Sequence, residues 1–290
     1  MIKIKRDQIT FNFSKNNTPI AFVEPNTELL FETRDGADGQ ILTGEEDLNQ
    51  LDISRSNPVT GPVFIVGAEQ GDTIIVEILN IELAPSGFLA VIAGRGVLKM
   101  DTLIKIIEVK NGKIIFSPSL QIPITPMIGT IGTAPADEEC GAAFVGNYGG
   151  NMDNIDATVG SKIYLPVFVK GGLLSIGDLH ANQGDGELMG SSLEIEGRVT
   201  LRIHLLKDKC WKRPWIETPT AWITCAHADT LPKAILYATD DMVNLLCEKI
   251  GIGKQEAYML ISLTGGVRLC QSCEWIVSPT VRAVFPKLEM

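Results

Sequence analysis

Two β-branched runs flank an Asn-Gly pair in the segment Leu103-Ile-Lys-Ile-Ile-Glu-Val-Lys-Asn-Gly-Lys-Ile-Ile-Phe116. Two-residue hairpin turns favour a pair such as Asn111-Gly112, because both central positions need a positive φ. The segment therefore predicts an antiparallel β-hairpin. Related turn signals occur at Pro25-Asn26 and Gly71-Asp72, which also separate apolar runs. We predict hairpins at all three places and antiparallel sheet for the first half of the chain.

The segment 193–204 alternates between apolar and polar residues. Leu193 and Val199 fall on one face, whereas Glu194 and His204 fall on the other. A period of two predicts a strand with one buried and one solvated face. We therefore expect Glu194 and His204 on the solvated face, where a ligand or catalytic role for His204 is disfavoured.

Helical periodicity appears only near the end of the chain. Pro232 suits a first helical turn, apolar residues then recur at helical spacing, and Gly251 ends the pattern. A shorter helix is predicted over 254–263, followed by strands at 267–271 and 281–285. We therefore expect a mainly β fold, with an antiparallel β-sandwich or barrel-like body and a carboxy-terminal α+β portion.

This pattern divides the chain into three segments of one compact unit. Residues 1–125 form a β-rich part, 126–205 a glycine-rich β part, and 206–290 the α+β part. The glycine-rich part is the expected place of an active site, because glycine permits tight turns and close backbone approach.

The composition excludes two classes of partner. The chain has 25 basic and 35 acidic side chains, a formal net charge of −10, whereas nucleic acid or an anionic membrane requires a positive surface. No apolar run of signal-peptide length follows the first charges, and the six cysteines are typical of reduced thiols rather than a disulfide framework. We therefore expect a cytoplasmic protein with neither a nucleic-acid nor a membrane partner.

Glycine and acidic residues concentrate in one part of the sequence. Between Gly129 and Gly190 lie 13 of the 28 glycines, eight acids, two lysines and the single histidine His180. If 173–180 is a strand, Asp178 and His180 lie on the same face. The Gly-Asp-Gly turn at 184–186 then brings Glu187 back toward them. Such a cluster suits a divalent metal with all three residues as ligands. Alternatively, Asp178 accepts a hydrogen bond from the imidazole of a metal-bound His180 and orients it.

Gly149-Gly-Asn-Met-Asp153 forms a second constellation. Its glycines permit a close approach, Asn151 suits an amide or carbonyl, and Asp153 suits a ligand or base. For both constellations, polar turns whose side chains bond only to the backbone are the structural alternative.

Three further groups have weaker functional signals. Cys270 and Cys273 have redox or zinc spacing without a second pair, and His227 precedes a helix. Cys140 has the residue type of an amidase nucleophile, but the neighbouring Glu138 and Glu139 would raise the pKa of its thiol. Structural roles are favoured for all of these.

The sequence closely resembles the acetamidase/formamidase family over residues 23–286. The resemblance rests on five blocks, Thr60-Gly-Pro-Val-Phe-Ile-Val-Gly-Ala-Glu-Gln-Gly-Asp72, Met127-Ile-Gly-Thr-Ile-Gly-Thr-Ala-Pro135, Gly149-Gly-Asn-Met-Asp153, Tyr164-Leu-Pro-Val-Phe168 and Gly177-Asp-Leu-His-Ala-Asn-Gln-Gly-Asp-Gly-Glu187. The chain departs from the family pattern at Tyr148, where many members have histidine, and at Gly266, where many have aspartate.

The resemblance implies hydrolysis of a small aliphatic amide, such as formamide or acetamide, to a carboxylate and ammonia. It also implies a homodimer or larger assembly and a divalent metal, zinc or calcium. An amide is a poor electrophile, so its hydrolysis needs an activated nucleophile, an oxyanion partner and a proton for the leaving nitrogen.

Our hypothesis is a metal that lowers the pKa of its bound water. The expected ligands are His180, Asp178 and Glu187, with Asp153 as a fourth. Glu139 is the expected proton carrier.

Asn151, with Gly150 and Tyr148 beside it, is expected to hold the substrate. Two alternatives stay open: a non-catalytic β-sandwich protein that binds a divalent cation or small polar ligand, and a metal-independent amidase that uses Cys140.

Overall fold

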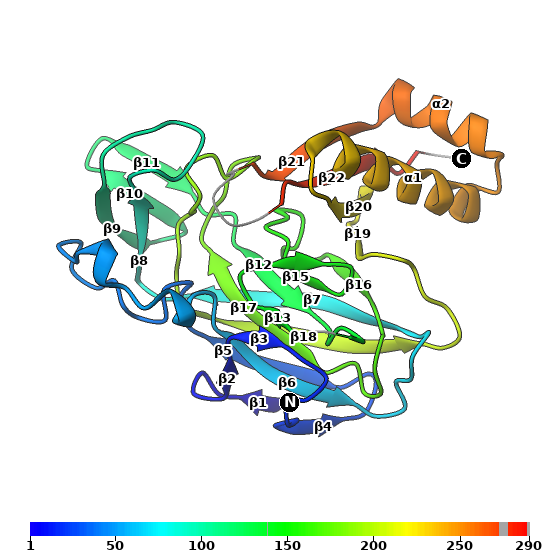
Figure 1. Ribbon diagram of the computed structural model, residues 1–290, viewed down its shortest axis with the longest axis horizontal. Helices are drawn as coiled ribbons and strands as arrows, with labels where there is room; N and C mark the ends of the chain where they lie inside the picture. Colours follow the sequence, from blue (N-terminus) through cyan, green and yellow to red (C-terminus); the bar gives the residue numbers. More distant parts are fainter. Residues whose placement is uncertain (138, 273–277, 289–290) are drawn as a thin grey trace.

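A computed structural model describes residues 1–137, 139–272 and 278–288 (Figure 1). Its largest sheet has nine strands, in the order β1 (Ile2–Ile4), β5 (Glu28–Thr33), β18 (Gly197–Leu206), β7 (Thr73–Leu83), β16 (Lys162–Pro166), β19 (Trp215–Glu217), β20 (Ala221–His227), β22 (Thr280–Pro286) and β21 (Gly266–Gln271). This sheet takes strands from 1–125, 126–205 and 206–290 alike.

The second sheet has seven strands and carries the glycine-rich motifs. Its order is β14 (Val145–Gly146), β15 (Gly149–Asn151), β12 (Met127–Gly132), β17 (Leu174–His180), β6 (Val59–Ile65) and β2 (Ile9–Thr10), with β4 (Ala21–Val23) also paired to β6. Side chains of both large sheets meet in one apolar cluster that includes Phe31, Ile74, Ile128 and Ile176. Each buried side chain of this size contributes about 1.5–3 kcal/mol of hydrophobic free energy relative to exposure.

Two smaller sheets complete the β structure. A four-stranded sheet contains β11 (Leu120–Pro123), β10 (Lys113–Ser117), β9 (Leu103–Lys110) and β8 (Ser86–Val91), and β13 (Cys140–Gly141) pairs with β3 (Asn12–Phe13). Two short 3₁₀ helices, η1 (Leu48–Gln50) and η2 (Ile53–Arg55), lie in the loop between β5 and β6.

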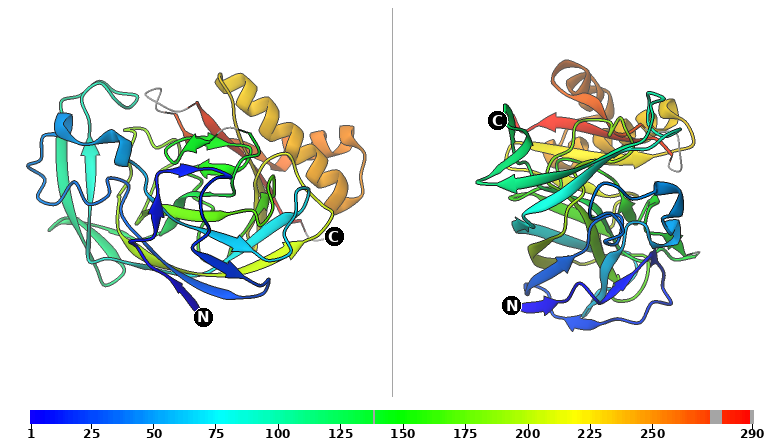
Figure 2. Two further views of the ribbon diagram at one scale, coloured as in Figure 1. Left: turned by 60° about the horizontal axis from the view of Figure 1, so that its bottom comes forward. Right: turned by 90° about the vertical axis from the view of Figure 1, so that its left-hand side faces the viewer.

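Helices α1 (Leu231–Ile250) and α2 (Lys254–Thr264) pack at the end of the molecule opposite the four-stranded sheet (Figures 1 and 2). The α1 residues Met242 and Leu246 belong to the same apolar cluster as Phe285 of β22. Gly251 ends α1 with a left-handed φ of 78°. No helix within residues 1–137, 139–272 and 278–288 has the length and apolar character that crossing a membrane requires.

The structure confirms the mainly β body with an α+β end. The Asn111-Gly112 hairpin joins β9 to β10, with Lys110 opposite Lys113. The predicted helices correspond to α1 and α2, and the two late strands to β21 and β22.

The prediction of hairpins at Pro25-Asn26 and Gly71-Asp72 is wrong. Asn26 does turn the chain, with a φ of 67°. However, β4 and β5 join different sheets, and so do β6 and β7. These turns therefore carry the chain from one sheet to the other, because turn residues specify a reversal but not the strand that is paired next.

Candidate active site

β17 positions the centre of the site. It lies between β12 and β6, and all seven of its residues are buried. Asp178 and His180 stand near its end, with Asp178 Oδ1 3.5 Å from His180 Nε2. Asp178 and Glu194 both line a cavity of about 150 Å³.

The Gln183 side chain fixes the tautomer of His180. Its Nε2 donates to two backbone oxygens, Asp153 O at 2.9 Å and Cys270 O at 3.3 Å. The Gln183 Oε1 atom therefore faces His180 Nδ1, at 2.8 Å. Because Oε1 can only accept, Nδ1 carries the proton and donates it. In the neutral imidazole, the lone pair is then on Nε2.

The Nε2 atom of His180 faces two carboxylates without forming a hydrogen bond. Glu194 Oε1 lies at 3.2 Å and Asp178 Oδ1 at 3.5 Å, yet Nε2 and Glu194 Oε2 are both buried without a hydrogen-bond partner. Buried polar atoms are usually paired. The ligand atoms of Asp178, His180 and Glu194 lie within 4.8 Å of one another, which suits a metal ion.

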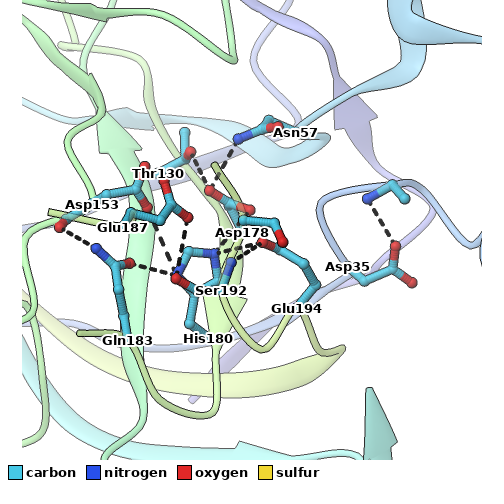
Figure 3. A network of polar contacts seen from close by, with 12 residues as sticks. Asp35, Asn57, Thr130, Asp153, Asp178, His180, Gln183, Glu187, Ser192 and Glu194 are labelled. Carbon is cyan, nitrogen blue, oxygen red and sulfur yellow. Dashed lines mark hydrogen bonds and ion pairs between the residues drawn. The ribbon is translucent and has the colours of Figure 1, made fainter. Parts of the chain in front are cut away.

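Asp153 and Glu187 lie on the other side of the imidazole (Figure 3). Asp153 Oδ1 is 3.8 Å from His180 Nδ1 and has no hydrogen bond, while Asp153 Oδ2 accepts one from Gln271. Glu187 Oε1 accepts a hydrogen bond from the Ser192 hydroxyl at 3.2 Å. Asp153, His180 and Glu187 form a second group that meets the spacing for a metal ion.

Asn57, Thr130 and Asn151 complete the polar wall around Asp178. Asn57 Nδ2 donates to Asp178 Oδ2 at 3.0 Å. The Thr130 hydroxyl has one proton and lies 2.9 Å from Asn151 Oδ1 and 3.1 Å from Asp178 Oδ2. Asn151 therefore lies in the cavity wall with its side chain held by Thr130.

Unusual backbone geometry brings the acids together. Asp153, Asp178 and Glu187 have φ angles of 45°, 58° and 43°, in the left-handed region that residues other than glycine seldom adopt. Gly129 has no room for a side chain, because a Cβ there would lie 2.7 Å from both Asp153 Oδ1 and Asp178 Oδ2. Strained residues of this kind concentrate at functional sites.

The burial of four carboxylates beside one imidazole shifts all five pKa values. Burial, followed by the charge of Asp178, raises the pKa of Asp153 to about 7. Burial raises the pKa of Glu194 to about 7 against the opposing charge of His180. Burial, followed by the charge of Asp153, raises the pKa of Glu187 well above 4.5.

His180 and Asp178 shift as partners of opposite charge. Burial alone would lower the pKa of His180, but the charges of Glu194 and Asp178 raise it well above 6.5. Burial would raise the pKa of Asp178, but His180 and the hydrogen bonds around the carboxylate hold it below 3.8. The cluster therefore has an excess of negative charge, for which protons or a cation can compensate.

Some residues predicted for the site lie elsewhere. Glu139 is exposed and accepts a hydrogen bond from Asn12 at 3.4 Å, and it does not line the cavity. Tyr148 is buried against Phe13, with ring centroids 5.2 Å apart. Gly150 is paired within the sheet.

The residues with weaker signals are not part of the acid cluster, although the Cys270 carbonyl accepts a hydrogen bond from Gln183. Cys140 pairs with Phe13, and His204 contacts Asn26 and Glu77. His227 is half-buried at the end of β20. Cys270 is buried, whereas Cys273 and Glu138 lie outside the described residues.

Glu194 is the main residue that sequence reasoning missed, and its predicted place on a solvated face is wrong. Only 6% of its surface is exposed. The regular strand β18 begins at Gly197, and Glu194 instead forms isolated bridges with Phe88 and His180. One sequence signal was available, because Glu194 lies four residues beyond the acidic, glycine-dense stretch. Gln183 and Asn57 were missed as well.

The fold and this buried acid–imidazole site define a class of protein. The model of the Acetamidase/Formamidase family matches residues 5–143 and 141–269. The chain belongs to this family.

Solved structures of this class superpose over nearly the whole chain. An acetamidase from Bacillus halodurans is 35% identical, with a TM-score of 0.93 and coverage of 98% of this chain and 97% of that one. A predicted acetamidase/formamidase from Thermoanaerobacter tengcongensis is 38% identical, with a TM-score of 0.94 and coverage of 98% and 95%.

Characterised relatives are longer. A formamidase from Methylophilus methylotrophus is 27% identical, with coverage of 65% of this chain and 62% of that protein. An acetamidase from Mycolicibacterium smegmatis is 29% identical, with coverage of 64% and 63%. The chain therefore spans less than two thirds of the length of these two relatives.

Proposed function

We propose that this protein hydrolyses small aliphatic amides to a carboxylate and ammonia. The observation that carries the proposal is the unpaired Nε2 of His180, which faces Asp178 and Glu194 at the edge of a cavity. The family membership and the names of the relatives support the same reaction.

A divalent metal fits the group Asp178, His180 and Glu194. The hydrogen bond to Gln183 leaves the Nε2 lone pair for a ligand, and the orphaned oxygen of Glu194 is on the same side. An imidazole with carboxylates suits zinc, whereas calcium takes oxygen ligands. When bound, such a metal polarises a carbonyl and lowers the pKa of water. In this proposal Glu194 takes the place of Glu187 among the predicted metal ligands, and Asp153 and Glu187 are not ligands.

We assign the proton transfer to Glu187 instead of Glu139. Glu187 lines the cavity, whereas Glu139 is exposed. The Ser192 hydroxyl donates to Oε1 of Glu187 and orients the carboxyl group. Glu187 lines the same cavity as Asp178 and Glu194, so a proton held at its carboxyl group can reach the leaving nitrogen of an amide bound there.

Asn151 is the proposed contact for the substrate amide. Thr130 supports its Oδ1, and its Nδ2 lies 3.4 Å from the Ala143 carbonyl oxygen. An amide side chain held in this way can orient the small carboxamide before reaction. Gly150 belongs to the same strand as Asn151, and Tyr148, which precedes this strand, packs on Phe13.

A pair of neighbouring glutamates tests the site. Glu194→Gln should lose bound zinc and lower kcat/KM for acetamide at least about 100-fold, because a ligand is lost. Glu196→Gln is the matched control, because Glu196 is half-buried and pairs with Arg6. Metal content is measured by mass spectrometry, and ammonia release by a coupled assay.

Chelation gives a second, reversible test. Dialysis against a chelator should abolish ammonia release and lower the melting temperature. A metal whose free concentration is 100 times its Kd stabilises the folded state by about 2.7 kcal/mol, and the chelator removes this stabilisation. Zinc should restore both. Full activity of the metal-free protein or of Glu194→Gln would refute the mechanism. Bound metal without turnover of any amide would indicate the non-catalytic binder.

The family resemblance supports a homodimer or larger assembly, which we propose and which size-exclusion chromatography with light scattering tests. The sequence composition supports a cytoplasmic location, which we also propose. Thiol alkylation should leave the rate unchanged, because Cys140 is not part of the cavity wall.

A further inference from the structure

The cavity beside the acids has a second, apolar wall. The loop between β5 and β6 and the strand β8 with its continuation supply this wall, whose side chains are Ile41, Leu48, Leu51, Phe88, Ala90 and Ile92. Asp153, Asp178, Glu187 and Glu194 line the same cavity, together with polar side chains such as Gln40 and Arg95. One cavity therefore joins reactive groups to an apolar space.

This apolar wall is a cluster separate from the main core. Ile41, Phe88 and Ala90 are buried in it, and Leu48 and Leu51 are only partly buried. The partly buried side chains present surface to the cavity. Apolar surface of this kind gains free energy when an apolar group replaces water.

The loop that carries the wall is fixed to the acids at both ends. The backbone N–H of Asn57 donates to the carbonyl of Gly36 at 2.8 Å and closes the loop. The Asn57 side chain bonds Asp178, and Gly36 lies against Asp178 and Glu194. Inside the loop, Asp38 pairs with Arg34 and Arg55. The distance from the acids to the apolar wall is therefore set by the fold.

The size of the cavity indicates what it accepts. The whole cavity, acids included, measures about 150 Å³, the volume of an apolar cavity, engineered in another protein, that binds benzene. Acetamide is smaller than benzene and leaves part of this volume unfilled, and formamide has no acyl carbon chain at all.

We propose that this pocket takes the acyl chain of unbranched primary amides with four to six carbons, with the carboxamide at the acids. This inference rests on the proposed amide hydrolysis and names its substrate class.

A chain-length series tests the inference. We expect kcat/KM for ammonia release to rise about fourfold per methylene from acetamide, because each buried methylene contributes that factor. Pentanamide should then exceed acetamide about 60-fold. Binding of the same amides is measured by calorimetry, so that the pocket is tested even if turnover fails.

Ala90→Leu fills the pocket and should lower the ratio of pentanamide to acetamide kcat/KM at least about tenfold. Ala93→Leu is the matched control, because Ala93 is exposed and does not line the cavity. If Ala90→Leu does not fold, Leu51→Ala gives the test instead, because it removes apolar contact and should lower the same ratio.

A maximum at formamide or acetamide, or an unchanged ratio in folded Ala90→Leu and Leu51→Ala, would overturn the inference. If no amide is hydrolysed but pentanamide binds more tightly than acetamide and Ala90→Leu removes this difference, the pocket stands and the proposed hydrolysis fails. If no amide is hydrolysed and binding does not depend on chain length, both fail.

Discussion

Gly36→Ala tests whether Asp178 and Glu194 act together as ligands. A Cβ at position 36 would lie 2.6 Å from Glu194 Oε2 and 2.7 Å from Asp178 Oδ1. Carbon–oxygen contacts normally stay beyond about 3.3 Å, so both oxygens must move by about 0.6 Å. Gly36 is not among the glycines with positive φ, so the backbone itself accepts alanine.

The expected loss falls on the site rather than on the fold. Disturbing the groups that hold a metal ligand typically lowers metal affinity or activity about 10–100-fold, which is about 1.4–2.7 kcal/mol. We expect zinc affinity and kcat/KM for acetamide to fall within this range. The melting temperature of the metal-free protein should change little, because both contacts of the new methyl group are with carboxylate ends and alanine reduces the entropy of the unfolded chain.

Gly184→Ala is the control for this substitution. Gly184 is exposed near the same site, and a Cβ there meets no atom within 4 Å. Zinc affinity is measured by competition with a chromophoric chelator, and activity by ammonia release. If Gly36→Ala keeps both quantities within twofold of Gly184→Ala, Asp178 and Glu194 do not form the proposed ligand pair.

Two further substitutions test the surroundings of the site. Gln183→Leu removes the acceptor for His180 Nδ1 and should weaken zinc binding about 10–100-fold. Gln183→Glu keeps an acceptor and should retain more of the zinc affinity. Equal losses of affinity in a zinc titration would contradict the role of Gln183 in positioning His180. Arg282→Met leaves Asp156 and Asp185 without their buried partner and should destabilise the protein by about 2–3 kcal/mol in urea unfolding. Lys233→Met, at an exposed pair, should leave the free energy of unfolding nearly unchanged, and equal effects of the two substitutions would refute the distinction.

Local sequence patterns predicted local structure well but not the choice of partner strands. The β9–β10 hairpin and helix α1 are determined by nearby residues, such as Asn111-Gly112 and Gly251. Pro25-Asn26 and Gly71-Asp72 also mark turns, but the strands on either side belong to different sheets. That choice depends on which long-range pairing buries more apolar surface, and no local pattern contains this information.

The candidate site shows the same division. Asp178 and His180 come together because they are two positions apart on one strand, and Asp153 and Glu187 adjoin glycine-rich turns. Glu194 reaches His180 through a bridge to β17 from a segment whose alternation predicts a solvated glutamate. The regular alternation of buried and exposed residues does not extend to the segment before Gly197, the first residue of β18. Sequence patterns therefore do not identify those site residues that lie on irregular backbone and have no recognisable local motif.

Charge balance separates this cluster from the structural ion pairs of the same protein. Where Asp156 and Asp185 adjoin the core, the fold supplies Arg282, whose side chain is 1% exposed. Asp153, Asp178 and Glu194 instead share the single imidazole of His180. One imidazolium cannot neutralise three carboxylates, and uncompensated burial of charge is strongly unfavourable. Protons or a cation can compensate for this charge, and because the ligand atoms are already in place we propose a metal site rather than a structural network.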